Sequence, residues 1–227
     1  MSIRLEFQRR IVPVGDAAVL IELGEVLDSA INQQVYALDE WLAAGALDGV
    51  LARVPGYCSI LISYDPQKLT FSEVTNWLEE RLRSCPPAGQ RQPRLVTIPV
   101  CYGGEDGPDL EDLAQLHRMS LDEVVRRHTA PVYTVGMMGF TPGFAYLMGL
   151  DPELATPRLA NPRTLVPAGA VGIAGAQTGI YPLDSPGGWQ LIGRTDLALY
   201  NPQQAPYFLH SPGDQVRFVV AEGSAVR

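Results

Sequence analysis

The segment from Met138 to Thr195 constrains the fold of this chain more than any other. It is crowded with glycine and proline, yet apolar and aromatic residues such as Phe144, Val171 and Trp189 recur between them. Flexible linkers and disordered tracts lack that apolar content. The segment therefore predicts a folded set of short strands and tight loops. Because loops on a rigid scaffold often carry binding and catalysis, we expect the functional site here.

The second half of the chain has the pattern of a mainly-β domain. Two helices are expected to begin at Asp109 and Ser120, the latter with a capping box to Glu123. Helix signals then end near Ala130, and short apolar runs follow, each bounded by Gly, Pro, Asn or Asp. The candidate strands are Val132–Val135, Phe144–Met148, Ala170–Ala174, Trp189–Gly193, Leu197–Tyr200 and Gln215–Val220. Such spacing predicts a closed or nearly closed β-barrel over residues 95–227.

Residues 1–84 show a different pattern. Strand-like runs alternate with two helical stripes, one capped by Asp28 and one opened by a capping box of Thr70 and Glu73. This order predicts a small α+β domain with both helices on one face of an antiparallel sheet. Three prolines, a glycine and charged residues then predict a linker over residues 85–94.

Composition limits the classes of partner. The formal net charge is −8, which gives no electrostatic basis for binding nucleic acid or anionic membranes. No basic-then-apolar leader pattern opens the sequence, and no apolar run approaches the roughly 18 residues of a membrane helix. The three cysteines, Cys58, Cys85 and Cys101, are odd in number and widely spaced. We therefore expect reduced thiols and a cytoplasmic protein.

The small numbers of lysine and histidine residues limit the catalytic mechanisms that this chain can support. Lys68 is the only lysine and no Walker loop is present, so a P-loop nucleotide site is not expected. The histidines His117, His128 and His210 lack metal-ligand spacing, and no metal site is expected within this chain. No G-x-S-x-G elbow indicates a serine nucleophile. Arginine, carboxylate, hydroxyl and backbone amide groups are left to carry any catalysis.

Several long stretches of sequence indicate a family. GFTPGFAYL, NPRTLVPAG, VGIAGAQTGIYPLDSPGGW and LIGRT, with IPVCYGG and PVGDAAVLIELG nearer the N-terminus, resemble the allophanate hydrolase subunit 1 family. That family includes the B-type subunits of 5-oxoprolinase and the kinase inhibitor KipI. The resemblance covers nearly the whole chain. It implies that the barrel is cyclophilin-like, a likeness of fold that brings no isomerase activity with it.

The resemblance also implies a function, namely the B-type subunit of an ATP-dependent 5-oxoprolinase that cleaves 5-oxo-L-proline to L-glutamate. ATP is then a co-substrate, with Mg²⁺ shared with partner subunits. The implied partners are a C-type subunit, which is the homologue of allophanate hydrolase subunit 2, and a separate A-type subunit. This chain alone is expected to be inactive. Two alternatives stay open: a KipI-like inhibitor of a sporulation histidine kinase, and an allophanate or urea carboxylase-type subunit.

Three arginines of the Gly-Pro segment are candidate anion ligands. Arg158 and Arg163 each follow a proline that restricts the backbone, which suits bidentate capture of a carboxylate or phosphate. Surface arginines that bond to loop carbonyls would show the same pattern. Arg194 follows Gly193, where a ligand can approach the backbone closely. Exchange of Arg163 for Lys is expected to lower activity with little change in thermal stability.

Four further residues complete the predicted site. Gln177 and Thr178 can offer an amide and a hydroxyl to a lactam, or can simply form a turn between two glycines. Tyr181 can form part of the pocket wall or contact the ligand directly. His128 lies at the end of a helix, where it can serve either as an acid-base group or as a cap of the helix C-terminus. We therefore predict catalytic roles for His128, Arg163, Gln177 and Arg194, and substrate binding by Arg158, Thr178 and Tyr181.

Overall fold

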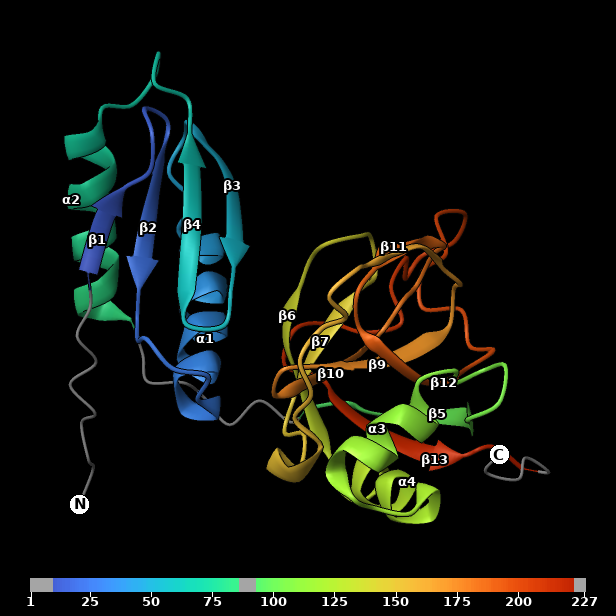
Figure 1. Cartoon of the computed structure of the whole chain (residues 1–227). Coiled ribbons are helices and arrows are strands. Elements are labelled where there is room, and N and C mark those ends of the chain that lie inside the picture. The colour runs from blue at the N-terminus through green and yellow to red at the C-terminus, as the bar shows by residue number, and fades with distance from the viewer. Residues whose placement is uncertain (1–9, 86–92, 223–227) are drawn as a thin grey trace. The chain divides into compact units, whose positions relative to one another are not determined.

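The computed structural model describes residues 10–85 and 93–222. Contacts between residues divide the chain into two compact units, 1–92 and 93–227 (Figure 1). Each unit has a hydrophobic core of its own. Most of the predicted linker, residues 86–92, lies outside the described residues.

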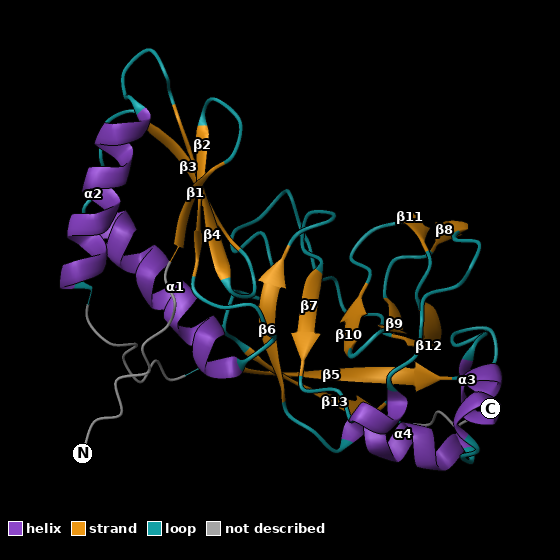
Figure 2. Cartoon of the chain, turned by 60° about the vertical axis from the view of Figure 1, so that its left-hand side comes forward, coloured by secondary structure: helices purple, strands orange, loops and turns teal. Residues whose placement is uncertain are grey.

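A four-stranded antiparallel sheet and two helices form the first unit. The strands lie in the order β1-β2-β4-β3, and both helices cover the same face of the sheet (Figure 2). The elements are β1 (Arg10–Pro13), β2 (Ala18–Glu22), α1 (Ser29–Ala44), β3 (Val50–Pro55), β4 (Ser59–Tyr64) and α2 (Phe71–Ser84). They give the α+β arrangement that the sequence predicts.

Local sequence signals determine where both helices begin. The Asp28 carboxylate accepts hydrogen bonds from the amides of Ala30 and Ile31 at the start of α1, and these amides have no acceptor within the helix. Thr70 and Glu73 form the complete capping box of α2. Each helix then buries one apolar stripe. The stripes comprise Ile31, Val35, Leu38 and Leu42 on α1, and Val74, Leu78 and Leu82 on α2.

The second unit is a closed seven-stranded barrel, which confirms the predicted mainly-β barrel; its kinship with cyclophilins stays a prediction. The order is β10-β7-β6-β13-β5-β12-β9, and only β13 and β5 pair in parallel. The barrel strands are β5 (Leu95–Tyr102), β6 (Tyr133–Met138), β7 (Ala145–Met148), β9 (Ala170–Ala174), β10 (Gln177–Ile180), β12 (Gln190–Arg194) and β13 (Gln215–Val220). The remaining elements are α3 (Leu110–His117), α4 (Leu121–Thr129), the 3₁₀ turn Pro152–Leu154, and a two-stranded sheet of β8 (Arg163–Val166) and β11 (Ser185–Gly187).

Apolar side chains are gathered inside the two units. In the barrel Ile98, Tyr102, Tyr133, Val135 and Phe218 are at most 2% exposed. They come from strands whose alternate residues face inward, as expected for a small barrel filled by side chains. Among the described residues, no helix is both long enough and apolar enough to cross a membrane.

The strands differ from the sequence-based expectation in four places. β8, β10 and β11 lie outside the candidate strands, and residues 197–200 form no strand. Only an isolated bridge joins Tyr200 to Phe208 there. Gly175, with a φ of 56°, turns the chain from β9 directly into β10, and Gln177 pairs with Ala174. The residues predicted to form a turn therefore belong to the second strand of a tight hairpin.

The starts of α3 and α4 also differ from expectation. Asp109 precedes α3, but its side chain makes no capping hydrogen bond. Ser120 accepts a hydrogen bond from the Glu123 amide at 3.2 Å. The Glu123 carboxylate, however, binds Arg126 and Arg127 at 2.7 and 2.6 Å. The capping box of α4 is therefore only half formed, because arginines outcompete the backbone amide for the carboxylate.

Candidate functional site

The loop from β6 to β7, residues 139–144, separates two pockets of the second unit. Phe140 lines both pockets, is 58% exposed and has a φ of 68°. A non-glycine residue adopts this backbone conformation only where its surroundings impose it, and such residues concentrate at functional sites. Gly143, with a φ of 87°, has no room for a side chain, because a Cβ there would lie 2.9 Å from the Cβ of Tyr200.

The first pocket, named here the Arg158 pocket, has a volume of about 240 Å³. Aromatic rings form most of its wall. Phe144 packs edge-to-face against Tyr181 and Trp189, with ring centroids 5.3 and 5.5 Å apart, and such contacts hold rings in fixed orientations. The pocket is lined by Phe140, Phe144, Tyr146, Arg158, Pro162, Tyr181, Pro186, Gly187, Gly188 and Trp189.

Arg158 supplies the only formal charge among the residues that line this pocket. Its side chain is exposed, and within the described residues it has no hydrogen-bond or ion-pair partner. Burial raises the pKa of the Tyr146 and Tyr181 hydroxyls, and the positive charge of Arg158 opposes that rise. The pocket therefore combines aromatic walls with a guanidinium that is available to an anion. The structure brings together Arg158 and Tyr181 of the predicted substrate-binding set.

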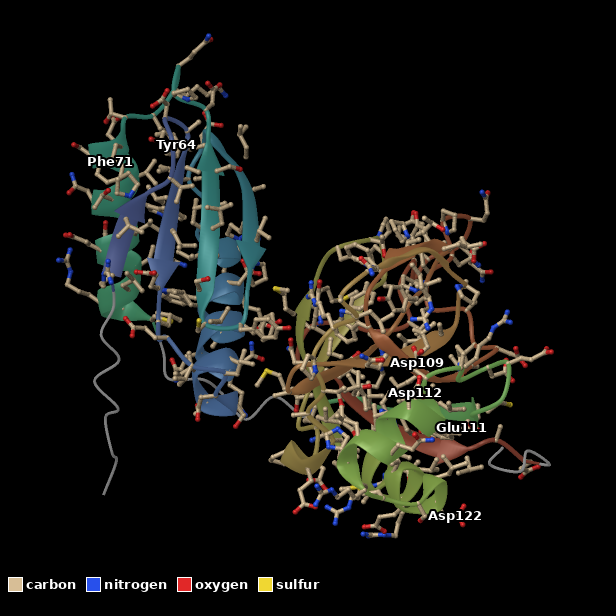
Figure 3. All side chains as sticks on the ribbon, viewed as in Figure 1. Tyr64, Phe71, Asp109, Glu111, Asp112 and Asp122 are labelled. Carbon is tan, nitrogen blue, oxygen red and sulfur yellow. The ribbon has the colours of Figure 1, made fainter. Side chains whose placement is uncertain are left out.

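Arg163 forms an ion pair within the second unit. Its Nη2 donates to Asp109 Oδ1 at 2.6 Å, and Asp109 Oδ2 accepts from the Leu191 amide at 2.6 Å. Figure 3 labels Asp109 beside α3. The Asp109 side chain is 9% exposed and that of Arg163 is 29% exposed. This ion pair ties β8 to the start of α3 and to β12. The Arg163 guanidinium is therefore already paired with a carboxylate of the chain, whereas Arg158 is paired with none among the described residues, and a role of Arg163 as an anion ligand stays a prediction.

Arg194 and Gln177 line neither pocket. The Nε of Arg194 donates to the carbonyl of Ala168 at 3.2 Å. Gln177 is the half-buried first residue of β10. The structure therefore does not bring these two predicted catalytic residues to the Arg158 pocket.

His128 and Thr178 are both fully buried in the barrel core. The Nδ1 of His128 lies 2.8 Å from the Tyr102 hydroxyl, and its Nε2 lies 2.9 Å from the Thr178 hydroxyl. Thr178 Oγ1 also donates to the carbonyl of Gly172 at 3.0 Å. Both ring nitrogens are thus occupied by protein hydroxyls away from either pocket. In this arrangement His128 and Thr178 pair with each other in the core, and their predicted acid-base and substrate-binding roles stay predictions.

Acidification is expected to destabilise the fold through His128. Burial lowers the pKa of His128 from 6.5 to about 3. As the pH falls below 6.5 the unfolded chain binds a proton that the folded chain does not, so stability present at neutral pH is lost. Urea unfolding of wild type and His128→Gln between pH 4 and 7 tests this. The variant is expected to show the smaller slope of unfolding free energy against pH, and equal slopes would contradict the assignment.

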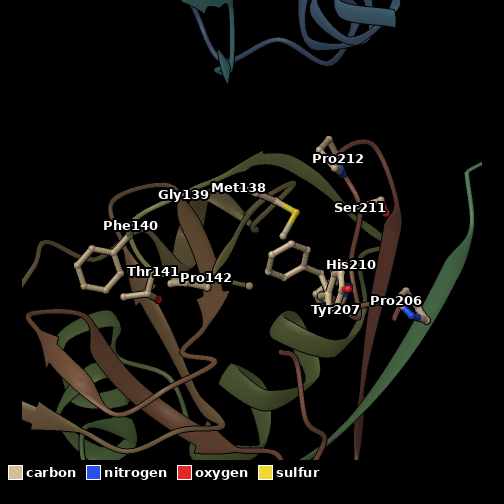
Figure 4. Close-up of a pocket in the computed structure, with 12 residues that line it drawn as sticks. Met138, Gly139, Phe140, Thr141, Pro142, Pro206, Tyr207, His210, Ser211 and Pro212 are labelled. Carbon is tan, nitrogen blue, oxygen red and sulfur yellow. The ribbon is translucent and has the colours of Figure 1, made fainter. Parts of the chain in front are cut away.

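The second pocket, named here the His210 pocket, has a volume of about 700 Å³ and was not anticipated from the sequence. It lies between residues 138–143 and residues 206–212 (Figure 4). These segments are far apart in the chain, so only the fold joins them. The one local signal is the presence of prolines in both. The lining residues are Met138, Gly139, Phe140, Thr141, Pro142, Gly143, Pro206, Tyr207, Phe208, His210, Ser211 and Pro212.

Metal binding is not supported by the arrangement of side chains. Across residues 10–85 and 93–222, no group of three or more His, Cys, Asp or Glu side chains could hold a metal ion. Mg²⁺ has a strong preference for carboxylate and other oxygen ligands.

Comparison with known proteins places the chain in a family. Residues 9–210 match the model of the carboxyltransferase domain, subdomain C and D. The B subunit of 5-oxoprolinase from Bacillus subtilis is 41% identical over 96% of this chain and 94% of its own length. Urea amidolyase of Saccharomyces cerevisiae is 26% identical over 90% of this chain but 13% of its own length. The solved structure of TTHA0988 superposes with a TM-score of 0.80 at 41% identity over 91% of this chain, which spans 40% of that chain. This chain therefore belongs to the carboxyltransferase family defined by subdomains C and D.

Proposed function

We propose that this chain is the B-type subunit of an ATP-dependent 5-oxoprolinase, which opens 5-oxo-L-proline to L-glutamate. The observation that carries the proposal is its 41% identity to the B subunit of a 5-oxoprolinase over nearly the full length of both chains. A urea-degrading role has weaker support, because the similarity to urea amidolyase is 26% and confined to 13% of that protein. The A-type and C-type subunits of the enzyme are the partners that we infer, and the cytoplasm is the compartment.

We infer that the Arg158 pocket holds 5-oxoproline. The substrate is a small, nearly flat ring that carries one carboxylate. The pocket offers the complementary features, namely aromatic walls from Phe144, Tyr181 and Trp189 and one unpaired guanidinium at Arg158. A guanidinium binds a carboxylate through two parallel hydrogen bonds, which also orients the ring. The volume of the Arg158 pocket, about 240 Å³, suits a ligand as small as 5-oxoproline better than a nucleotide.

The chemistry explains why ATP is needed. A lactam carbonyl is a weak electrophile because the ring nitrogen donates electron density to it. Transfer of a phosphoryl group from ATP to the lactam oxygen would create a good leaving group. Water then attacks the activated carbon, and the ring C–N bond breaks as the nitrogen takes up a proton, which leaves an acyl phosphate. A second water hydrolyses this acyl phosphate to L-glutamate and inorganic phosphate. Arg158 would hold the carboxylate, and the aromatic walls would exclude bulk water from the ring.

We infer that partner subunits supply groups that the described residues do not offer. The sequence has no Walker loop, and the described residues hold no cluster suited to a metal ion. Phosphoryl transfer depends on positive charge around the transferred group. We therefore infer that Mg²⁺ and most of the contacts to the ATP phosphates lie on surfaces that the partners complete.

Activity is expected to require the complex. This chain alone should release no glutamate from 5-oxoproline and ATP, whereas mixtures with both partner subunits should. Glutamate release and ADP formation are measured for the isolated chain, for the A-type and C-type partners without it, and for the full mixture. Turnover by the isolated chain, or undiminished turnover without it, would overturn the proposed function.

A further inference from the structure

The His210 pocket has no part in the substrate binding proposed above. Its volume of about 700 Å³ lies within the roughly 300–1,000 Å³ of small-molecule sites. Phe140 forms a wall of both pockets, so the two cavities lie on either side of one side chain. A ligand here would be a direct neighbour of a ligand in the Arg158 pocket.

The lining of the His210 pocket selects against charged ligands. None of its lining residues carries a charged side chain, and most of its wall is aromatic or proline. Burying an unpaired carboxylate or phosphate against such a wall is unfavourable. The aromatic faces of Phe140, Tyr207 and Phe208 instead suit a flat, uncharged ring.

His210 adds a hydrogen-bonding function to this apolar lining. It is 2% exposed, and neither of its ring nitrogens has a partner among the described residues. The Oγ1 of Thr141, on the opposite segment, is likewise buried without one. Burial lowers the pKa of His210 to about 4, with Asp214 and Arg94 acting in opposite directions, so the ring is neutral near pH 7. A neutral imidazole offers one donor and one acceptor.

We propose that the His210 pocket binds an uncharged, flat heterocycle with adjacent hydrogen-bond donor and acceptor groups, as on the edge of a nucleobase. The donor and acceptor of the imidazole would pair with that edge, which relieves the cost of two buried, unpaired nitrogens. Tyr207 is 54% exposed, so little packing opposes the rotation that would admit a ligand to the buried ring. Among the nucleobases we infer that adenine binds here. This part of the inference rests on the proposed function, in which ATP is the co-substrate.

Binding of adenosine to the full-length chain tests the proposal directly. The chain is labelled with ¹⁵N at histidine, and the imidazole resonances of His210 are followed as adenosine is added, with 2-pyrrolidinone as the matched lactam probe. Adenosine is expected to shift the His210 resonances in a saturable way. The His210→Phe and Tyr207→Ala variants are expected to weaken binding about tenfold or more, because each removes a contact to the ring. Arg158→Gln, in the other pocket, should leave adenosine binding unchanged.

The outcomes separate this inference from the proposed function. Saturation by 2-pyrrolidinone without adenosine would mean that the pocket takes the lactam, and a response to neither probe would overturn the site. In an active complex, His210→Phe should raise the KM for ATP and leave the KM for 5-oxoproline unchanged. If adenosine shifts His210 while the complex lacks 5-oxoprolinase activity, the proposed function fails and the site stands. If the complex is active and adenosine leaves the His210 resonances unchanged, the proposed function stands and the adenine site fails.

Discussion

Replacement of Arg158 by Gln is expected to lower kcat/KM for 5-oxoproline in the assembled enzyme by about 100-fold. A hydrogen bond to a charged partner contributes about 1.5–3 kcal/mol, and a bidentate pair makes two of them. A loss of about 2.7 kcal/mol corresponds to a factor of about 100. The loss should be visible mainly as a higher KM, since the carboxylate does not react. Steady-state kinetics with 5-oxoproline as the varied substrate measures it.

The thermal midpoint should not change in Arg158→Gln, because the exposed guanidinium has no partner among the described residues. Arg217→Gln is the matched control. Arg217 is an exposed arginine of β13 that lines neither pocket, and its replacement should leave kcat/KM unchanged. Equal losses in both variants would show that net charge, rather than the Arg158 pocket, is responsible. An unchanged kcat/KM in Arg158→Gln would show that Arg158 does not bind the substrate carboxylate.

Replacement of Arg163 by Met is expected to destabilise the second unit by about 3 kcal/mol. The Asp109 carboxylate is 9% exposed and would lose its only ion-pair partner among the described residues. Removing one member of a buried ion pair leaves an uncompensated charge and typically costs about 3–5 kcal/mol. We expect the lower end because Arg163 itself is 29% exposed. Urea unfolding of wild type and variant at pH 7 measures the difference.

A double variant distinguishes an ion pair from simple packing. Asn at position 109 keeps an oxygen that can accept from the Leu191 amide, but it carries no charge. Arg163→Met combined with Asp109→Asn should therefore be more stable than Arg163→Met alone. If the double variant instead loses as much unfolding free energy as the two single variants together, the ion pair contributes nothing. The sequence-based expectation concerned Arg163→Lys, which keeps the positive charge, whereas Arg163→Met removes it.

The sequence predicts the parts of the fold that are determined locally. Asp28 and the Thr70–Glu73 box are bonded to neighbours two or three residues away, so the sequence alone locates both helices of the first unit. Residues 170–174 and 215–220 form strands with the predicted bounds, because turn-forming residues delimit them. β10 escapes notice because its short run between Gly175 and Ile180 contains too few apolar residues to show a strand period.

The candidate site depends on contacts between distant parts of the chain, which a single sequence does not reveal. Arg158, Arg163 and Arg194 have similar local sequence contexts. What separates them is a carboxylate 54 residues from Arg163, a carbonyl 26 residues from Arg194, and the absence of either at Arg158 among the described residues. The same limit explains His128, whose helix-end position is visible in sequence although its burial between β5 and β10 is not.

The parallel pairing of β13 with β5 has a consequence for how the barrel is assembled. Gln215 pairs with Leu95. The barrel therefore closes only when two strands from opposite ends of the second unit's sequence pair with each other. Contacts between such distant positions slow folding, and a ribosome would release residues 95–214 before the closing strand emerges. The family match ends at residue 210, ahead of β13. A fragment cut at that boundary would expose the edges of β5 and β6, and exposed edges promote aggregation.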